Sequence, residues 1–358
     1  MNIVIFSPTS TKLSPDYDKI KPIGGADSAL LKLIRILGKD HTVRAFIPLH
    51  ASECFENEIL YFPYMDLFKH DVDCDILILN RKIWVIPSNV KYKKLILYSQ
   101  DTADTPCFNG CDTLDHFDKI IVLSEFHKQN LIDKFKTNPD KFVIIGNATP
   151  KHNIRLTTIT NTKPLKFIYC STPFRGLVVL ARMWKHIKAK YPEAELHVFS
   201  SMKIYQMAAE QEKIMFDVLY NKLKNMKGIK YHGSVPQKEL WKHLAESKLL
   251  LYPNTYPETY CNVLMESRAV MTPFITSDLG ALKETGGDAG VYIQGDGYTN
   301  EYQNEFLRQL DIILNDERFY NQLVTNCYPI RTFQGFERDM QTFINSVNIL
   351  DDKDLKKI

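Results

Sequence analysis

The sequence has no long hydrophobic run and no strong excess of charge of either sign. No stretch approaches the roughly 18 apolar residues that a membrane-spanning helix requires. The formal net charge of the 358 residues is +3, and lysine and arginine are spread along the chain beside aspartate and glutamate. No basic tail or stripe points to nucleic acid. We therefore expect a soluble globular protein with no stable membrane span and no nucleic-acid partner.

Cysteine is present without the pattern of a metal site or a disulfide framework. The seven cysteines are scattered, and Cys107 and Cys111 are the one close pair, with no second Cys/His pair at zinc spacing. The first residues, Met1–Ser7, form too short an apolar run for a signal peptide and lack a basic flank. We interpret the cysteines as reduced thiols and expect a cytoplasmic location.

Neither of two further signatures supports a site. No Gly-x-Gly-x-x-Gly follows a predicted strand, which disfavours an NAD-type dehydrogenase. Asp73 and Asp75 have the Asp-x-Asp spacing of some metal sites, but they precede the apolar run Ile76–Leu79. We therefore place them in a loop that enters a strand, and we expect no metal.

Short apolar runs alternate along the chain with segments of helical periodicity. Such continuous apolar strands are typical of parallel sheets covered on both faces. The strands are predicted at Asn2–Ser7, Thr42–Ile47, Ile76–Leu79, Leu95–Tyr98, Ile120–Leu123, Phe142–Ile145, Lys166–Tyr169, Glu195–Phe199, Ile229–His232, Leu249–Tyr252 and Phe274–Thr276. The helices are predicted at Ala26–Leu37, Ser124–Phe135, Gly176–Lys190, Ala208–Lys224, Gln237–Ser247, Cys261–Val270, Asn304–Leu314 and Phe333–Val347.

The alternation stops once and then restarts. Residues 151–164 are rich in Thr, Asn and Lys and show little periodicity, so we interpret them as a linker. The sequence thus predicts an α/β protein with one Rossmann-like domain over residues 1–150 and a second over residues 165–332.

The most informative stretch follows the strand that ends at Tyr252. A loop with two prolines leads to a helix that begins near Cys261, and Glu258 stands in the loop with Glu266 in the helix. The first amides of a helix lack partners and attract phosphate. Carboxylates accept hydrogen bonds from sugar and ribose hydroxyls. The bare spacing of the two glutamates is weak, and the surrounding context carries the interpretation.

This context resembles the nucleotide-sugar site of retaining glycosyltransferase family four, among the glycosyl transferases group 1. The resemblance implies the GT-B fold, in which two Rossmann-like domains face a central cleft, the first binding the acceptor. It also implies that a last helix, over about residues 333–350, packs back on the first domain. Most of Gly24–Asp296 is similar to the family, most clearly at Ser124–His127, Ser171–Leu177, His232–Trp241, Ala245–Pro253 and Pro273–Glu284.

The resemblance implies roles for particular residues. Glu258 would contact the hydroxyls of the donor sugar, Glu266 would hold the ribose, and Arg175 would neutralise the diphosphate. The Gly24–Gly25 turn would let the backbone approach the donor phosphates. The residues expected to bind the nucleotide sugar are Gly24, Gly25, Ser171, Thr172, Arg175, Val235, Glu258, Tyr260, Cys261, Asn262, Val263 and Glu266.

The second domain departs from the family at the phosphate-binding loop. Many relatives carry a second cationic residue ahead of the Arg175 position, where this chain has Ser171 and Thr172. Lys203 is an alternative source of positive charge. Cys261 stands where a glycine often begins the helix.

The first domain departs from the family at a catalytic position. Where many relatives have a histidine after a strand, this chain has Gln100, which cannot act as a base. Asp101 is a candidate substitute and joins Glu258 and Arg175 as a possible catalytic residue. We regard His116 and His127 as structural or surface residues.

We therefore expect a retaining, metal-independent hexosyltransferase that needs no cofactor. Its donor would be a nucleotide sugar, with a UDP-sugar slightly preferred over a GDP-sugar, and its acceptor a carbohydrate-type group on a glycan, lipid or protein. The leaving diphosphate would take the proton of the acceptor, so a separate base is not required. Two alternatives stay open: a degenerate protein that binds a nucleotide sugar or glycan without turnover, and another GT-B chemistry such as nucleotide-sugar epimerisation.

Overall fold

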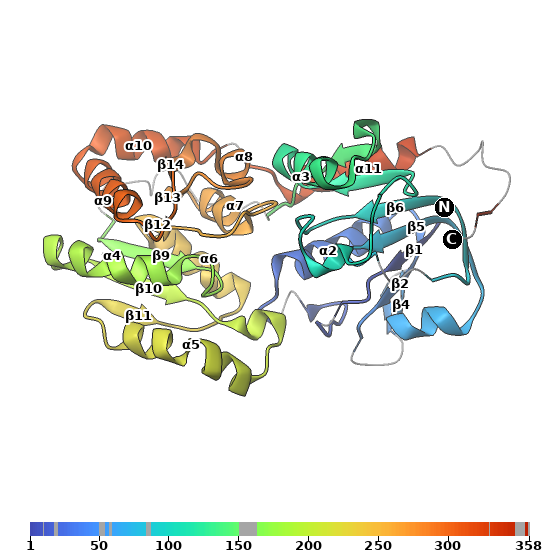
Figure 1. Cartoon of the computed structure of the whole chain (residues 1–358), viewed down its shortest axis with the longest axis horizontal. Helices are drawn as coiled ribbons and strands as arrows, with labels where there is room; N and C mark the ends of the chain where they lie inside the picture. The colour runs from blue at the N-terminus through green and yellow to red at the C-terminus, as the bar shows by residue number, and fades with distance from the viewer. Residues whose placement is uncertain are drawn as a thin grey trace. The chain divides into compact units, whose positions relative to one another are not determined.

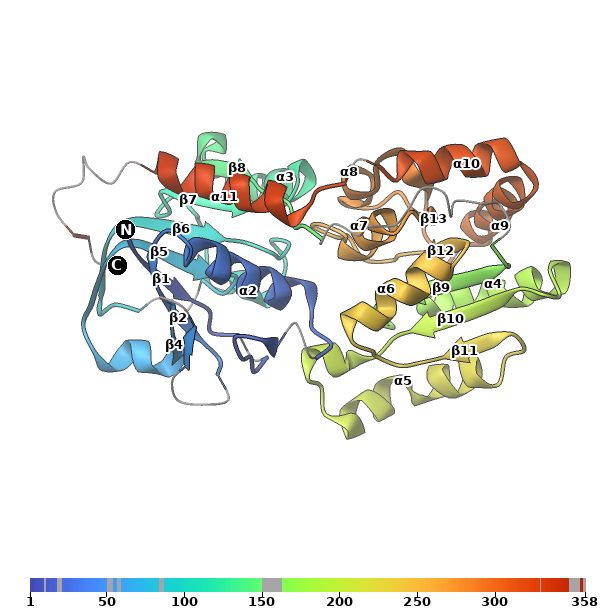
Figure 2. The same ribbon diagram turned by 180° about the vertical axis from the view of Figure 1, so that it is seen from behind.

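The chain divides into two compact units. A computed structural model describes residues 1–9, 11–17, 21–49, 54–56, 59–83, 87–149, 163–328, 330–347 and 355–356, with residues 54–56 described by their backbone alone. Unit 1 comprises Met1–Asp18, Ile23–Asn147 and Gln334–Ile358, and unit 2 comprises Lys19–Pro22 and Ala148–Phe333. The predicted linker, residues 151–164, lies outside the described residues except for its last two. Helices lie on both faces of the sheet in each unit, as the opposite views of Figures 1 and 2 show.

Unit 1 contains a sheet in the order β3-β4-β2-β1-β5-β6-β7-β8, parallel except where β3 pairs with β4. Its inner strands are apolar on both faces because helices cover both sides. In the register, Ile3 lies beside Val43 on one neighbouring strand and Ile76 on the other. The strands are β1 (Asn2–Phe6), β2 (Thr42–Ile47), β3 (Cys54–Glu56), β4 (Ile59–Pro63), β5 (Val72–Asn80), β6 (Val90–Tyr98), β7 (Lys119–Val122) and β8 (Phe142–Ile144).

The placement of Asp73 and Asp75 in a loop is wrong. Both residues lie inside β5, which begins at Val72, where buried and more exposed residues alternate. This part of the strand faces solvent on one side, so it lacks the continuous apolar run that the prediction relied on. The Asp75 carboxylate accepts a hydrogen bond from the Asn2 amide at 2.8 Å and pairs with Lys93 at 3.1 Å.

The helices of unit 1 include the last helix among the described residues. They are α2 (Gly25–Leu37), α3 (Glu125–Phe135) and α11 (Phe333–Ser346). Helix α11 buries Phe336, Met340 and Phe343, and its Gln341 donates a hydrogen bond to Asp40 at 2.6 Å. In Figure 2 the red α11 lies with the elements of unit 1, although it is distant from them in the sequence. The first and last parts of the described chain thus share one core.

Unit 2 contains an entirely parallel sheet in the order β11-β10-β9-β12-β13-β14. The chain adds β10 and then β11 on one side of β9, and afterwards adds β12, β13 and β14 on the other side. The direction of winding therefore reverses between β9 and β12. The strands are β9 (Lys166–Cys170), β10 (Glu195–Phe199), β11 (Ile229–Tyr231), β12 (Leu249–Tyr252), β13 (Phe274–Ser277) and β14 (Gly290–Ile293).

One core lies around this sheet, and it includes the fully buried Phe167 and Trp184, whose rings meet edge to face. The helices of unit 2 are α4 (Leu177–Lys190), α5 (Ala209–Lys224), α6 (Gln237–Glu246), α7 (Asn262–Ala269), α8 (Leu282–Gly286), α9 (Asn300–Asn315) and α10 (Glu317–Asn326). None of the helices in the described part of the chain is both long and apolar enough to cross a membrane.

A stack of histidines packs on one side of this sheet. The His197 Nδ1 and His232 Nε2 atoms are 3.1 Å apart, and the His232 ring lies parallel to Phe199 with centroids 4.3 Å apart. His243 joins them, and its Nδ1 is 3.2 Å from the Lys166 ammonium. Burial lowers the pKa of His197 to about 4, and the Lys166 charge acts in the same direction. The stack is therefore neutral at pH 7.

We predict that this stack makes the protein sensitive to mild acid. Because the folded-state pKa of His197 is about 4 and the ordinary value is 6.5, the unfolded chain binds a proton between these pH values that the folded chain does not. Stability should be full above about pH 6.5 and fall as the pH drops toward about 4. The melting temperature is measured across this range.

His197→Phe keeps a ring in the stack and should flatten the acid slope in part, because the buried His127 also has a pKa near 4. The matched control is His186→Phe on the exposed side of α4, which should leave the slope as it is. A slope that His197→Phe does not change would contradict this account.

Candidate functional site

Two loops meet at the carboxyl ends of β9 and β12. Open parallel sheets bind ligands where the direction of winding reverses, because the loops there diverge from neighbouring strands. Gly176, at the end of the β9 loop, has a φ of +92°, and a Cβ at this position would be 1.8 Å from the Pro253 carbonyl oxygen in the β12 loop. Only glycine permits this close approach of the two loops. The fold therefore places the Arg175 loop against the Glu258 loop.

Arg175 and Glu258 form an ion pair across these loops. The Arg175 Nε lies 2.7 Å from the Glu258 Oε1, and the side chains are 16% and 12% exposed. The Arg175 Nη1 donates to the Thr172 hydroxyl and to the Tyr205 hydroxyl, each at 3.1 Å. A buried charge is tolerated when it is paired and hydrogen-bonded. This guanidinium is paired with Glu258 through its Nε and hydrogen-bonded through its Nη1.

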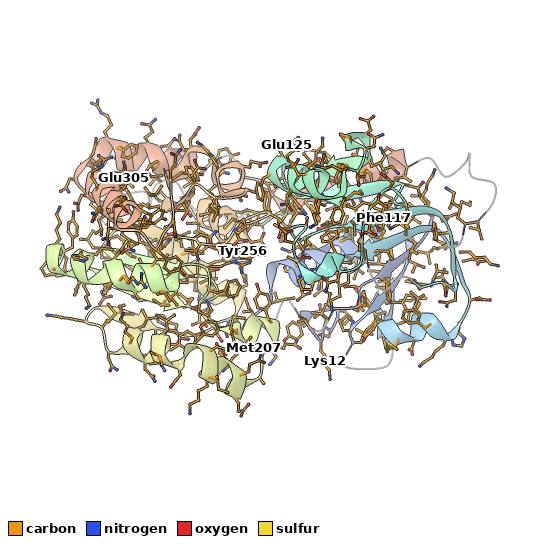
Figure 3. The ribbon with its side chains drawn as sticks, in the orientation of Figure 1. Lys12, Phe117, Glu125, Met207, Tyr256 and Glu305 are labelled. Carbon is orange, nitrogen blue, oxygen red and sulfur yellow. The ribbon has the colours of Figure 1, made fainter. Side chains whose placement is uncertain are left out.

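Aromatic rings hold the same guanidinium from its sides. The Arg175 Cζ lies 5.0 Å from the ring centroid of Phe174 and 5.0 Å from that of Tyr256. The two rings contact each other edge to face, with centroids 6.1 Å apart. Tyr256, labelled in Figure 3, comes from the loop after β12, and Phe174 comes from the loop after β9. Both loops thus contribute a ring to a preorganised arginine.

Glu258 is fixed through its backbone as well as its side chain. It forms a bridge with Gly280, and its carbonyl oxygen accepts a hydrogen bond from the Ala281 amide at 2.8 Å. The Tyr252 hydroxyl donates to the carboxylate at 3.0 Å. Burial raises the pKa of Glu258, and the Arg175 charge and the Tyr252 hydrogen bond offset part of this rise. The carboxylate therefore depends on these two partners to stay ionised.

Helix α7 begins beside Glu258, with Cys261 as its N-cap residue. The Cys261 amide is occupied, because it donates to the Thr285 hydroxyl at 3.2 Å. This corrects the expectation that all of the amides at the start of this helix lack partners. Cys261 is buried, whereas Tyr260, Asn262 and Val263 are partly exposed.

Glu266 lies one turn into α7 and contacts the neighbouring helix. Its carboxylate accepts a hydrogen bond from Gln237, the first residue of α6. Val235, in the loop before α6, is partly buried against the core of unit 2. Gln237 thus connects the first turn of α6 to the helix that carries Glu266.

The described residues of unit 1 hold the other candidates, and Asp101 is engaged there. Its two carboxylate oxygens accept hydrogen bonds from the Arg81 Nε and Nη2 at 2.7 and 2.8 Å. Burial by itself would raise the pKa of Asp101, but the ion pair with Arg81 outweighs burial and the pKa is lowered. Asp101 is therefore a weak base held by a bidentate ion pair.

The Gly24–Gly25 turn begins helix α2. Gly24 is its N-cap residue, with an extended backbone at a φ of −67° and a ψ of 151°. Any residue can adopt this backbone conformation. A requirement for glycine at this position would therefore come from a lack of room for a side chain. Gln100 is buried, and its side-chain oxygen accepts a long hydrogen bond from Asn147 at 3.5 Å.

The remaining histidine and lysine candidates have structural or surface positions. The Leu123 amide donates to the His127 Nδ1 at 3.2 Å, so the His127 Nε2 carries the proton and donates to the Asp101 carbonyl oxygen at 2.9 Å. Burial lowers the pKa of His127 to about 4, which leaves a neutral structural ring. His116 and Lys203 are exposed.

The fold brings Ser171, Thr172, Arg175, Glu258 and Cys261 together at one edge of one sheet. The residues that contact Arg175 or Glu258 and that sequence reasoning missed are Phe174, Tyr205, Tyr252 and Tyr256, and the missed partner of Glu266 is Gln237. No spacing signal connects Tyr205 to Arg175, because the contact depends on how two separate loops pack. Among the described residues, no group of three or more His, Cys, Asp or Glu side chains is arranged to hold a metal ion, and the described cysteines are free thiols.

The chain matches a known family of proteins over half of its length. The sequence model of the family described as "Glycosyl transferases group 1" matches residues 150–328, which is half of the chain and includes both loops of the site. The chain therefore belongs to this family, and it is a glycosyltransferase. No curated protein sequence matches the chain.

Solved structures share the fold across nearly the whole chain. Sucrose-phosphate synthase from Thermosynechococcus elongatus has a TM-score of 0.69 at 13% identity, over 97% of this chain and 99% of that chain. WaaG, a glycosyltransferase involved in lipopolysaccharide biosynthesis, has a TM-score of 0.67 at 14% identity, over 96% and 100%. Anabaena HepE in complex with UDP-glucose has a TM-score of 0.65 at 12% identity, over 96% and 100%. At such identities the likeness shows the fold, which is GT-B, as predicted.

We predict that the ion pair between Arg175 and Glu258 is strongly coupled in stability. Arg175→Met should cost about 3 kcal/mol of unfolding free energy, because it leaves a buried carboxylate without its cation. Adding Glu258→Gln to Arg175→Met should recover a large part of this loss, because the double variant has no unpaired charge. Urea unfolding of the wild type, the two single variants and the double variant measures the coupling. Additive losses would mean that the two charges do not stabilise each other.

Proposed function

We propose that this protein is a retaining, metal-independent glycosyltransferase of family four that transfers a hexose from a UDP-sugar to a carbohydrate-type acceptor. The observation that carries the proposal is the placement of Arg175 and Glu258. They come from the two loops at the point where the winding of the sheet reverses, beside the start of α7. A cation, a hydroxyl acceptor and a helix N-terminus are what a diphosphate joined to a sugar requires.

In this proposal each group meets one part of the donor. Arg175 binds the diphosphate and stabilises the negative charge that develops on it as the sugar leaves. Glu258 accepts hydrogen bonds from the sugar hydroxyls, and Glu266 accepts them from the ribose. A structure of the same fold, HepE, was solved with UDP-glucose, which supports a UDP-sugar over a GDP-sugar.

The proposed reaction is a displacement on one face of the sugar. The acceptor oxygen bonds to the anomeric carbon from the side on which the bond to the diphosphate breaks. Because the new bond forms on the face that the leaving group vacates, the configuration at the anomeric carbon is retained. A phosphate oxygen of the leaving group takes the acceptor proton. No side-chain base is needed, which is compatible with Gln100 and with the bidentate pairing of Asp101. Arg175 and the α7 amides take the role of a metal.

A second candidate function is donor binding without turnover. It is favoured by the loss of two cationic or basic positions in this chain, where Thr172 precedes Arg175 and Gln100 stands in the first domain. Thr172 accepts a hydrogen bond from Arg175 and cannot itself neutralise a phosphate. Binding of a nucleotide sugar with no hydrolysis or transfer over a broad acceptor panel would favour this function.

The proposed function is tested first by binding and then by turnover. The melting temperature is measured against UDP-, GDP-, ADP- and CMP-linked sugars, each with and without magnesium. A UDP-sugar should raise it without magnesium, with a stabilisation of about 2.7 kcal/mol at a hundredfold excess over the dissociation constant. If no nucleotide sugar raises the melting temperature, the proposal that a donor binds at Glu258 is contradicted.

Turnover of the donor that binds is then compared in two variants of unit 2. Glu258→Gln should lower kcat about 100-fold while the protein stays folded, because the sugar loses an ionic hydrogen-bond acceptor. Glu301→Gln, an exposed residue in the first turn of α9, is the matched control and should turn over like the wild type. Unchanged turnover in Glu258→Gln would remove this residue from the mechanism.

A further inference from the structure

Two buried tyrosines stand at the ends of the two strands that flank the site. Tyr252 is the last residue of β12 and Tyr169 is the next to last of β9, and both are fully buried. Their ring centroids are 5.9 Å apart. Leucine or phenylalanine would fill these core positions without introducing a hydroxyl that needs a partner. The hydroxyls therefore call for an explanation beyond packing.

Each hydroxyl bonds to the loop that follows its own strand. The Tyr169 hydroxyl donates to the carbonyl oxygen of Thr172 at 2.8 Å and also lies 3.1 Å from that of Arg175, so it supports the backbone of the arginine loop. The Tyr252 hydroxyl reaches a side chain instead, the Glu258 Oε1 at 3.0 Å. One tyrosine holds the loop that carries the cation, and the other holds the carboxylate itself.

The direction of the Tyr252 hydrogen bond follows from its partner. An ionised carboxylate only accepts, so the Tyr252 hydroxyl donates to Glu258. The Tyr252 oxygen is then available to accept from the Ser171 hydroxyl, which lies 3.4 Å away. Ser171, Tyr252 and Glu258 thus form a chain that runs from the β9 loop to the β12 loop. The Arg175 ion pair closes this chain into a ring.

We propose that Tyr252 is a positioning residue of the donor site, whose hydroxyl holds the Glu258 carboxylate in place when the Arg175 guanidinium turns toward a bound diphosphate. This inference rests on the proposed function. The contact between the Arg175 Nη2 and the Glu258 Oε2 is 3.5 Å, longer than the other polar contacts of the guanidinium. A phosphate oxygen can replace this contact at the smallest loss. Glu258 then keeps the Tyr252 hydrogen bond, which does not involve the arginine.

The consequence concerns the ionisation of Glu258. Its pKa is raised by burial and is brought back by Arg175 and by the Tyr252 hydrogen bond. When Arg175 is shared with a phosphate, the relative weight of the Tyr252 hydrogen bond increases. Removal of the Tyr252 hydroxyl therefore makes Glu258 easier to protonate, and a protonated Glu258 loses acceptor capacity for a sugar hydroxyl.

The test is the pH profile of kcat/KM for the donor in Tyr252→Phe and Tyr169→Phe. Both changes keep the ring and remove one buried hydroxyl, so the pair is matched. Tyr252→Phe should move the acidic limb to higher pH by about one unit, in keeping with the loss of one hydrogen bond to a charged group. Tyr169→Phe should lower kcat/KM and leave the limb where it is, because it acts on the loop backbone.

A readout without donor separates this inference from the proposed function. The carboxyl carbons of labelled glutamates are followed by NMR across pH, and Glu258→Gln assigns the Glu258 signal. Its midpoint should rise in Tyr252→Phe and stay in Tyr169→Phe, whether or not any nucleotide sugar binds. An unchanged Glu258 midpoint in Tyr252→Phe overturns the inference, as does an acidic limb that fails to move or moves equally in both variants. A protein that binds no donor but shows the shifted midpoint overturns the proposed function and leaves the Tyr252 contact established.

Discussion

The ion pair between Arg175 and Glu258 is the contact on which the rest of the site depends. It joins two loops that come from different strands, and both charges are removed from most of the surrounding water. The desolvation of two charges is costly, so such a pair persists only where hydrogen bonds satisfy the remaining atoms. Thr172, Tyr205 and Tyr252 supply these hydrogen bonds. The polar shell around the pair is therefore a requirement of its burial.

The geometry of the backbone makes this contact possible. Gly176 and Gly280 both have positive φ angles, and a Cβ on either would meet backbone atoms of the β12 loop. Each glycine thus lets a neighbouring segment approach the loop that carries Glu258. The reversal of winding between β9 and β12 supplies the position, and the two glycines supply the distance. The same arrangement keeps a cation and a carboxylate ready before any ligand arrives, which reduces the cost of ordering them on binding.

The sequence predicted the strands and helices whose patterns are strong. Thr42–Ile47, Glu195–Phe199 and Leu249–Tyr252 have the predicted bounds, because most residues of each strand are buried. The edge and short elements were missed, namely β3, β4, β14, α8 and α10. Strand β14, for example, is an edge strand that begins at Gly290 and is only partly buried, and its apolar run is limited to Val291–Ile293.

The contacts within the candidate site could be predicted from the sequence only in part, for a physical reason. Glu258, Arg175 and Ser171 follow strands, and the sequence shows that directly. Their mutual contacts come from the packing of two loops, and neither Tyr205 nor Tyr252 has a pattern that assigns it to a charged pair. The expectation for Asp101 took no account of Arg81, whose φ of 69° directs an unusual turn after β5. Arg81 lies twenty residues before Asp101, and its position depends on one backbone angle. No periodic pattern in the sequence therefore predicts this ion pair.

The return of α11 to unit 1 bears on the order in which the protein forms. Unit 2 is almost wholly one continuous stretch of chain, but unit 1 is assembled from an early segment and a late one. During synthesis the ribosome completes the residues of unit 2 before it makes α11. The hydrophobic surface of unit 1 against which Phe336 and Met340 pack thus remains uncovered until the residues of unit 2 have been synthesised. A nascent chain that stops after unit 2 exposes this surface to chaperones and proteases until α11 covers it.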